Sequence, residues 1–399
     1  MTKARPKSTS AKPPLRATSP CDVASAAARD HEIRTRLTRW FAAGARALPW
    51  RTAPRDPWRS LVSEFMLQQT QVSRVLDHFE PFIVRFPSPK AMASAPESAV
   101  LAAWSGLGYY RRARMLHQAA REIVDRFDAT VPQSVEELRT LPGIGRYTAG
   151  AIASIVFGHA APIVDGNVSR VLLRIEGREE SALQATDWTW KRSTDLIKGV
   201  PSPRRNAPLF NEGLMELGAT VCTPKAPRCD ACPLATLCAA KAAGSQERIP
   251  TPKVPAKKSA IVCDVVVVRD ADGRLLIEQR PAKGLWAAMW QAPTRERHLP
   301  KSPRPSNNRR SAATAPLFEM PLPALLTDLG LGRVVVVDDQ PTEFDHQTTH
   351  RDVRFRVWQG LAAKPLARGK DPIRKWATRV EVASMAISNA QRRILLSES

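Results

Sequence analysis

Four cysteines lie within one short stretch of this chain, so the fold must bring their thiols close together. They are separated by six, two and five intervening residues: Cys222, Cys229, Cys232 and Cys238. Four soft ligands on one loop bind either zinc or an iron–sulfur cluster. Structural zinc sites usually use two short cysteine pairs, whereas this stretch has a single Cys-x-x-Cys and unequal loops, which favours a [4Fe–4S] cluster. Zinc and a disulfide pair stay as the alternatives.

The charge of the chain points to a polyanionic partner. Lys and Arg number 60 against 38 Asp and Glu, which gives a formal net charge of +22. Such an excess attracts nucleic acid, although basic tails alone could also produce it. The 43% hydrophobic content is ordinary, and no apolar run approaches the roughly 18 residues of a membrane-spanning helix. Membrane insertion is therefore not expected.

The 399 residues are enough for two or three domains with sizeable cores. Residues 1–28 are basic, poor in acids and rich in Pro, Ser and Ala, so we expect a disordered tail; an organelle transit peptide is the alternative. Residues 29–243 have helical periodicity, and residues 244–259 form a linker rich in Pro, Lys and Ser. Residues 260–399 contain β-rich runs and a polar, basic insertion at 295–316.

A Pro- and Gly-containing hairpin between two short helices is predicted at Leu141–Ile152. Gly143 and Gly145 let the backbone approach another molecule closely, and free N–H groups at the start of the next helix suit a phosphate oxygen. Such a hairpin can grip the DNA backbone without reading sequence, although an ordinary turn between helices has the same composition.

Two carboxylates have the surroundings of an acid–base pair. Asp165 stands where the N-cap of the helix after it belongs, and the helix dipole and backbone donors there would hold it ionised. Glu64 lies on a predicted apolar helix over 61–79, sharing a face with Gln68 and Gln71. Partial burial would raise the pKa of Glu64 and let it donate a proton. The alternatives are a plain helix cap and a solvated glutamate.

These features occur together in an order that resembles a known family. The motifs are SLVSEFMLQQTQV at 60–72, WSGLGYYRR at 104–112, the hairpin, VDGNVSRV at 164–171, FNEGLMELGA at 210–219 and the cysteine loop at 222–238. They are similar to MutY-type adenine DNA glycosylases of the endonuclease III, or helix-hairpin-helix, superfamily. The resemblance implies a mainly α-helical catalytic region with an iron–sulfur loop, followed by an α+β Nudix-like (MutT-like) domain.

The resemblance also implies an activity and roles for residues. A monofunctional glycosylase of base excision repair would flip adenine out of a mispair with 8-oxo-guanine or guanine and hydrolyse its N-glycosidic bond. Glu64 would protonate the base and Asp165 would face the cationic sugar, with Tyr147 and Asn167 as positioning neighbours. The predicted DNA contacts, from the hairpin and the resemblance together, are Gln68, Gln69, Tyr109, Gly143, Gly145, Thr148, Glu212, Thr349 and His350.

Two alternatives within this reading stay open. A bifunctional glycosylase/lyase acting on oxidised pyrimidines would need a lysine at Tyr147, and Ser169 is not a lysine either. A DNA-binding protein without catalysis would need neither Glu64 nor Asp165. Glu212 could bond the flipped adenine or be a plain helix glutamate.

The C-terminal domain should bind rather than hydrolyse, because the segment after Gly284 lacks the clustered acids that hold magnesium in pyrophosphohydrolases. Its segment from Phe344 to His350, including His346, resembles the loop that recognises oxidised guanine in the family, with Thr349 placed to test the purine. We expect double-stranded DNA as partner, a monomer, and the bacterial cytoplasm as location.

Overall fold

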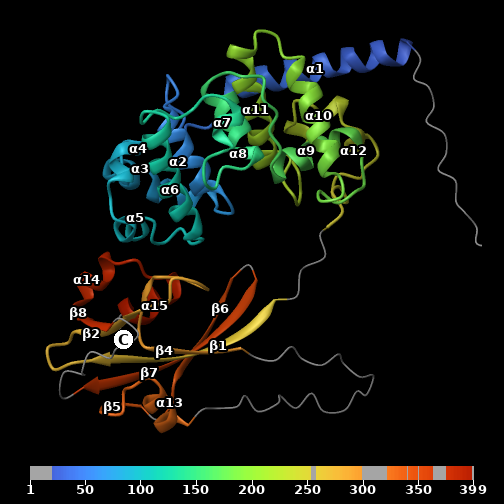
Figure 1. Cartoon of the computed structure of the whole chain (residues 1–399). Helices are drawn as coiled ribbons and strands as arrows, with labels where there is room; N and C mark the ends of the chain where they lie inside the picture. The colour runs from blue at the N-terminus through green and yellow to red at the C-terminus, as the bar shows by residue number, and fades with distance from the viewer. Residues whose placement is uncertain are drawn as a thin grey trace, which may run out of the picture. The chain divides into compact units, whose positions relative to one another are not determined.

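The computed structural model describes residues 20–252, 258–298, 321–338, 340–348, 350–362 and 374–397 (Figure 1). The chain divides into two compact units. One contains Met1–Arg46 and Gly150–Lys253, and the other contains Ala47–Ala149 and Val254–Ser399. No helix within these described ranges is long and apolar enough to cross a membrane.

The first unit is helical. Its elements are α1 (Pro20–Gly44), a π-helical turn (Ile152–Val156), α9 (Gly166–Glu176), α10 (Thr186–Lys198), α11 (Pro203–Thr220), two 3-10 turns (Cys229–Ala231 and Ala235–Leu237) and α12 (Ala239–Ala242). α11 packs closely on α1 because Gly213 has no side chain; a Cβ there would lie 3.1 Å from Leu37. α9 ends at Gly177, whose φ of +66° is one that glycine adopts readily.

The second unit contributes the helices that precede the hairpin and the C-terminal sheet. Its helices before the sheet are α2 (Pro57–Leu67), α3 (Val72–Arg85), α4 (Pro89–Ala93), α5 (Glu97–Ala103), α6 (Arg111–Arg126) and α7 (Val135–Leu138), and α8 (Arg146–Ala151) spans the boundary between the units.

The single helix predicted over 61–79 is wrong. α2 ends at Leu67, Gln68 leaves the helical conformation, and Gln71 is the N-cap of α3. Gln71 therefore does not share a helical face with Glu64 and Gln68. Apolar spacing continues across this break, which is why the periodicity did not reveal it.

The C-terminal part builds a mixed sheet. Its strands are β1 (Ser259–Arg269), β2 (Leu275–Gln279), β3 (Trp290–Gln291), β4 (Thr294–His298), β5 (Val334–Val336), β6 (Thr342–Gln347), β7 (Arg351–Ala362) and β8 (Arg374–Ala377). The order is β3-β2-β1-β7-β5, with β4 on β1, β6 on β7 and β8 on β2. β1 and β7 pair in parallel, whereas β2 and β4 pair antiparallel with β1, and β5 and β6 pair antiparallel with β7. The predicted α+β architecture is confirmed.

Both faces of this sheet are covered, because side chains alternate along β1. Cys263 and Val265 face a core completed by α14 (Arg379–Ser384) and α15 (Asn389–Leu396). Val266 and Val268 face the opposite core, against α13 (Leu322–Asp328). Cys263, interpreted from sequence as a buried non-ligand, lies in the first of these cores.

Three segments differ from the sequence prediction where the structure describes them. The expected tail is helical from Pro20 onward, as the first turns of α1, and residues 1–19 lie outside the described residues. The expected insertion begins with β4, which pairs with β1; its remainder, 299–316, is outside the described residues.

The third segment is the expected linker, whose first half packs against the helices. Ile249 is 1% exposed and joins an apolar cluster with Leu173, Ala185 and Ala240. Arg174 Nε donates to the Ile249 carbonyl at 2.8 Å, and Thr251 N donates to the Glu180 carbonyl at 3.2 Å. Residues 253–257 lie outside the described residues.

The packed segment generates a stability prediction. Ile249→Ala should lower the unfolding free energy by about 2–5 kcal/mol, because it leaves a cavity in the cluster. Leu183→Ala, at a site that is 73% exposed, is the matched control and should change stability by less than about 0.5 kcal/mol. Urea unfolding of both variants measures this, and equal stabilities would show that residues 244–252 are a free linker after all.

Candidate active site and DNA interface

Glu64 lies on α2, the helix that precedes the loop at 68–70. α2 begins at Pro57 because Asp56 caps it, accepting from Arg59 N at 2.7 Å. Glu64 is half-buried between the buried residues Ser63 and Phe65. Glu64 therefore has the partial burial on which the proton-donor hypothesis depends.

The two glycines of the hairpin have different surroundings. Ser134 caps α7 as predicted, accepting from Glu137 N at 3.1 Å. Gly143 has a φ of +79°, and a Cβ there would lie 2.7 Å from the Met115 Cβ and 2.8 Å from the Phe65 ring. Gly143 is thus required for packing inside the protein, whereas Gly145 is exposed, with open space around its Cα, and is the glycine that another molecule can approach.

The other predicted contacts of this unit differ in exposure. Gln69 is exposed and Tyr109 is 45% exposed, while Gln68 and Tyr147 are half-buried. Thr148 is 3% exposed, so it offers almost no surface to a phosphate. The side chains that can enter a DNA helix are therefore those of the two loops at 68–70 and 106–109.

Asp165 begins a relay of hydrogen bonds in the first unit. As predicted, it is the N-cap of α9, and its Oδ1 accepts from Val168 N at 2.7 Å. Its Oδ2 accepts from Asn167 Nδ2 at 3.1 Å, and Asn167 Oδ1 in turn accepts from Arg170 at 2.8 Å. Arg170 Nε donates to the carbonyl of Cys222 at 2.8 Å. The carboxylate is thereby oriented by a chain of contacts that ends at the cysteine loop.

The relay depends on a close approach of α11. A Cβ on Gly218 would lie 2.6 Å from the Asn167 Cβ, so glycine is needed where α11 passes this residue. Arg170 also donates to the Gly218 carbonyl at 2.8 Å.

The cap donors alone would lower the pKa of Asp165, whereas the shift in the structure is upward. Burial raises the pKa of this half-buried carboxyl, and the hydrogen bonds from Val168 and Asn167 and the charge of Arg170 offset the effect only in part. An oriented carboxylate short of water interacts strongly with a nearby cation, because the local dielectric screens the attraction little.

Glu212 lies on α11 and is 5% exposed, so it is not a solvated helix glutamate. The preceding Asn211 is fully buried and donates to Ser154 Oγ at 2.7 Å and the Ala161 carbonyl at 2.9 Å. These bonds fix the turn of α11 that carries Glu212.

The four cysteines of the loop are half-buried free thiols, so the described residues form no disulfide among them. Burial raises the pKa of Cys232 to about 11, and the neighbouring thiols act in the same direction. No group of three or more His, Cys, Asp or Glu in the described ranges is placed to hold a single metal ion.

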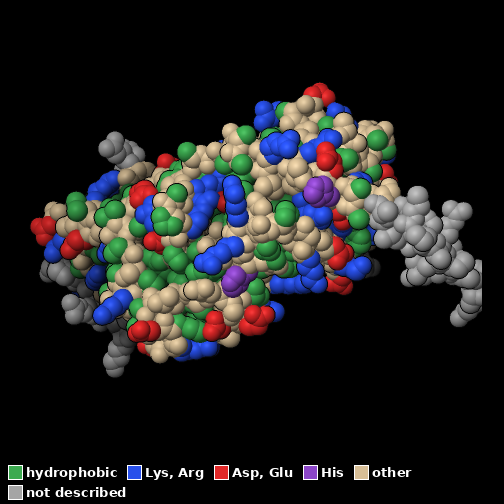
Figure 2. All heavy atoms as spheres, turned by 90° about the horizontal axis from the view of Figure 1, so that it is seen from above, with side chains coloured by type: hydrophobic (Ala, Val, Ile, Leu, Met, Phe, Trp, Pro, Cys, Tyr) green, Lys and Arg blue, Asp and Glu red, His purple; other side chains and the backbone are tan. Residues whose placement is uncertain are grey.

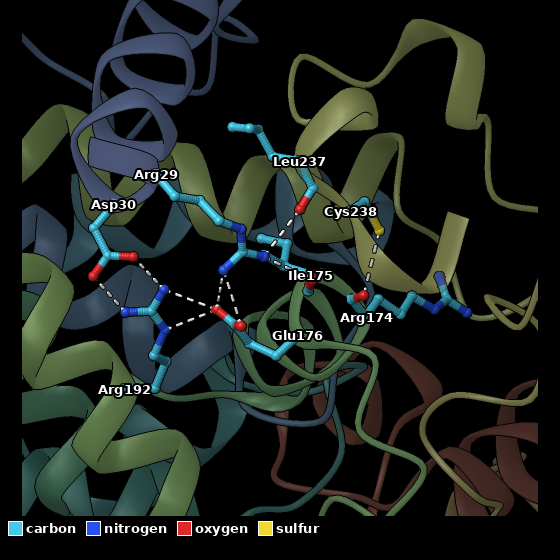
Figure 3. Close-up of polar contacts among 8 residues, drawn as sticks. All are labelled: Arg29, Asp30, Arg174, Ile175, Glu176, Arg192, Leu237 and Cys238. Atoms are coloured by element: carbon cyan, nitrogen blue, oxygen red, sulfur yellow. Dashed lines mark hydrogen bonds and ion pairs between the residues drawn. The ribbon is translucent and has the colours of Figure 1, made fainter. Parts of the chain in front are cut away.

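Arginines contact both ends of this loop, and Figure 3 shows the contacts at the Cys238 end. Arg174 donates to Cys222 Sγ at 3.3 Å and to the Thr223 carbonyl at 2.7 Å, and its own carbonyl accepts from Cys238 Sγ at 3.3 Å. Arg29 of α1 donates to the Leu237 carbonyl at 3.0 Å and to Glu176 at 3.0 Å. Sequence reasoning missed these arginines.

The same figure shows how Arg29 is held. Glu176, at the end of α9, also accepts from Arg192 Nε at 2.9 Å, and Arg192 donates to Asp30 at 2.6 Å. This ion-pair network fastens α1 and α10 to the end of α9, next to the cysteine loop.

The predicted recognition loop begins as a strand. Phe344 and His346 lie on β6, half-buried, and pack against Phe355 and Trp286. The Phe344 and Phe355 rings stack at 5.0 Å. Of the turn that follows, His350 is exposed and its carbonyl accepts from Ser259 N at 3.0 Å, while Thr349 lies outside the described residues.

The structure thus groups the predicted residues by unit. The second unit contains Glu64, Tyr147, the exposed loop residues and the hairpin glycines Gly143 and Gly145. The first unit contains Asp165, Asn167, Glu212 and the four cysteines of the loop. Basic side chains are plentiful on the face seen in Figure 2, interspersed with hydrophobic ones, as the net charge requires.

Comparisons with known proteins agree with this arrangement. Residues 62–193 match the family model of the HhH-GPD superfamily of base excision DNA repair proteins, and residues 264–397 match that of the NUDIX domain. The human adenine DNA glycosylase is 31% identical over 426 aligned positions, covering 91% of this chain and 73% of the relative.

Two further similarities cover part of the chain. The Mycolicibacterium smegmatis adenine DNA glycosylase is 46% identical over 50% of this chain and 66% of its own length. A thermostable thymine-DNA glycosylase structure is 26% identical, with a TM-score of 0.49, covering 55% of this chain and 99% of that chain. On the similarity to the human relative, which spans both domains, the chain belongs to the adenine DNA glycosylase family.

Proposed function

We propose that this enzyme removes adenine mispaired with 8-oxo-guanine or guanine from double-stranded DNA. The observation that carries the proposal is the Asp165 carboxylate, oriented by Val168 N and Asn167 and short of solvation. A group of this kind suits a reaction that develops positive charge on a sugar ring. The net charge of +22 suits a DNA substrate.

The two carboxyl groups have different tasks in this mechanism. Glu64, protonated, donates its proton to a ring nitrogen of the flipped adenine, and the electrons of the N-glycosidic bond leave with the base. Asp165 stabilises the cationic sugar electrostatically. Water then adds to the anomeric carbon and returns a proton to Glu64, so the products are adenine and an abasic site.

The alternatives account for less of the structure. A lyase would need an amine nucleophile, but Tyr147 stands at the expected lysine position and Ser169 is 4% exposed. A protein that only binds DNA would have no use for the relay that orients Asp165. Tyr147 and Asn167 act as positioning residues in the proposal.

We propose that the four cysteines hold a [4Fe–4S] cluster. The fit rests on the donor set: four half-buried free thiols, with Arg174 donating to Cys222 Sγ and bracing the adjacent carbonyls. Burial, and to a lesser extent the neighbouring thiols, raises the pKa values of Cys229, Cys232 and Cys238, and a bound iron centre would offset this cost. The cluster would supply a rigid core to the loop that carries Lys225 and Arg228.

The activity predicts a clear assay outcome. Wild type should release adenine from a duplex with one A:8-oxo-guanine pair in a single turnover, with strand breaks only after alkali. Glu64→Gln should slow excision by about 10²–10⁴-fold, because it cannot donate the proton. Glu122→Gln, an exposed helix glutamate paired with Arg126, is the control and should retain the wild-type rate. Nicking without alkali would place the enzyme with the lyases instead.

Substitution of the Asp165 carboxyl group should change both the excision rate and the pH dependence of stability. Asp165→Asn keeps an N-cap but should slow excision at least about a hundredfold. Because the folded pKa of Asp165 is raised, the folded state binds protons more tightly, and unfolding free energy falls as pH rises from the ordinary to the raised pKa. Asp165→Asn removes this pH-dependent cost but replaces the acceptor of Asn167 Nδ2 with an amide donor, so its stability relative to wild type should rise as pH rises from the ordinary to the raised pKa.

Thermal unfolding between acid and neutral pH measures this, with Asp56→Asn as the matched N-cap control on α2. If the stability difference between Asp165→Asn and wild type does not change over this pH range, the burial cost assigned to Asp165 is contradicted.

The cluster predicts a coupled loss. Cys229→Ser should reduce iron content and weaken DNA binding together, because one of four ligands to the proposed cluster is gone. Cys263→Ala, a buried cysteine of the C-terminal sheet, should keep both. Iron analysis and a DNA-binding titration on the same preparations decide; unchanged iron and affinity in Cys229→Ser would refute the ligand set.

A further inference from the structure

A buried arginine joins the two exposed loops of the second unit. Arg112 lies in the first turn of α6 and is 7% exposed. One terminal nitrogen donates to the carbonyls of Phe65 at 2.9 Å and Met66 at 2.8 Å, and also to that of Gln68. These carbonyls belong to the last turn of α2, whose acceptors have no partner within the helix. Arg112 thus closes the end of the helix that carries Glu64.

The other terminal nitrogen reaches the second loop as well. It donates to Thr70 Oγ1 at 2.9 Å and, with longer contacts, to the carbonyls of Leu107 at 3.4 Å and Gly108 at 3.3 Å. The guanidinium also lies over the Tyr109 ring, 5.1 Å from its centroid. One rigid fork therefore ties the loop at 68–70 to the loop at 106–109.

Each loop holds a residue in a conformation that side chains disfavour. Gln69 has a φ of +56° and Tyr109 a φ of +47°. The left-handed region costs a non-glycine residue about 1–2 kcal/mol, so surrounding contacts must impose it. Gln69 is exposed and Tyr109 is 45% exposed, so both strained residues present their side chains outward from the loops that Arg112 joins.

The contacts require the shape of arginine rather than its charge alone. No carboxylate pairs with Arg112 in the described residues, and its charge is met by carbonyls and by the faces of Tyr109 and Trp104. Burial lowers the pKa of Arg112 to about 10, so it remains protonated at neutral pH. Lysine would keep the charge but has no planar fork to serve both loops.

We propose that Arg112 is a positioning residue that fixes Gln69 and Tyr109 relative to each other and thereby governs opening of the duplex around the adenine. The inference rests on the proposed function and on the exposure of these two side chains, which are the predicted DNA contacts of the two loops. Arg112 itself touches neither base nor sugar.

The experiment compares opening with bond cleavage. Single-turnover excision by wild type and Arg112→Lys is measured on two duplexes: one with A:8-oxo-guanine in matched flanks, and one with the same pair in mismatched flanks that open it beforehand. Arg112→Lys should lose about tenfold or more on the matched duplex and markedly less on the pre-opened one. A 2-aminopurine in place of the adenine reports unstacking, and its fluorescence rise on binding should shrink.

Two controls separate positioning from general damage. Leu116→Ala, at a fully buried site on the same helix, should destabilise the protein yet keep the wild-type fluorescence rise and lose equally on both duplexes. Arg126→Lys changes an exposed arginine of α6 and should behave as wild type. Thr70→Val removes one partner of Arg112 at smaller cost, so it tests the inference if Arg112→Lys does not fold.

The inference would be overturned if Arg112→Lys lost excision rate equally on both duplexes, or if its fluorescence rise matched that of wild type. The same results for Thr70→Val would overturn it where that variant replaces Arg112→Lys. Absence of excision by wild type on either duplex would instead contradict the proposed function, and the fluorescence arm, which needs no bond cleavage, would still decide the role of Arg112.

Discussion

Buried guanidinium groups that donate to backbone carbonyls hold the loops of both units. Arg174 is 2% exposed and ties the cysteine loop to α9 and to the packed segment at Ile249. Arg170 ties α9 to α11 and to Cys222. Arg112 ties α2 to the loop before α6. Bonds from a charged donor are stronger than neutral ones, and a fork with several donors fixes direction as well as distance.

This bracing explains how irregular segments can carry the functional groups. Asp165 lies outside the regular turns of α9, and Gln69 and Tyr109 lie in left-handed conformations. Such positions persist only where neighbours over-determine them. In the first unit the same arginine that orients Asn167 also reaches the cysteine loop, so a proposed cluster and a proposed catalytic carboxylate share one support. Disordering the cysteine loop should therefore also disturb the orientation of the Asp165 carboxylate.

The sequence predicted what depends on local pattern. The β-rich runs, the caps Ser134 and Asp165, and the hairpin follow from residues close together in the chain, and the structure contains each of them. The break at Gln68–Gln71 could not be predicted, because the group that closes α2 is Arg112, on a distant helix. The pKa direction of Asp165 was missed because its cap donors are visible in the sequence, while its burial is not.

The sequence gives only a weak indication of the structural role of Arg170 and Arg174. Arg170 and Arg174 are four residues apart on α9 and therefore lie on one face of the helix. Their neighbours in the sequence include the apolar residues Val168, Val171 and Ile175. Charged residues on an apolar helix face are usually read as snorkelling to solvent. Only the structure shows that both are buried and serve carbonyls of α11 and the cysteine loop.

The central claim is that Asp165 acts on a cationic sugar as a poorly solvated, oriented carboxylate. The most direct test compares binding of two duplexes in which the adenosine is replaced by a charged pyrrolidine or by a neutral tetrahydrofuran of the same shape, opposite 8-oxo-guanine. Wild type should bind the charged duplex far more tightly, and Asp165→Asn should lose most of that preference while binding the neutral duplex as before. An equal preference in wild type and Asp165→Asn would contradict the account.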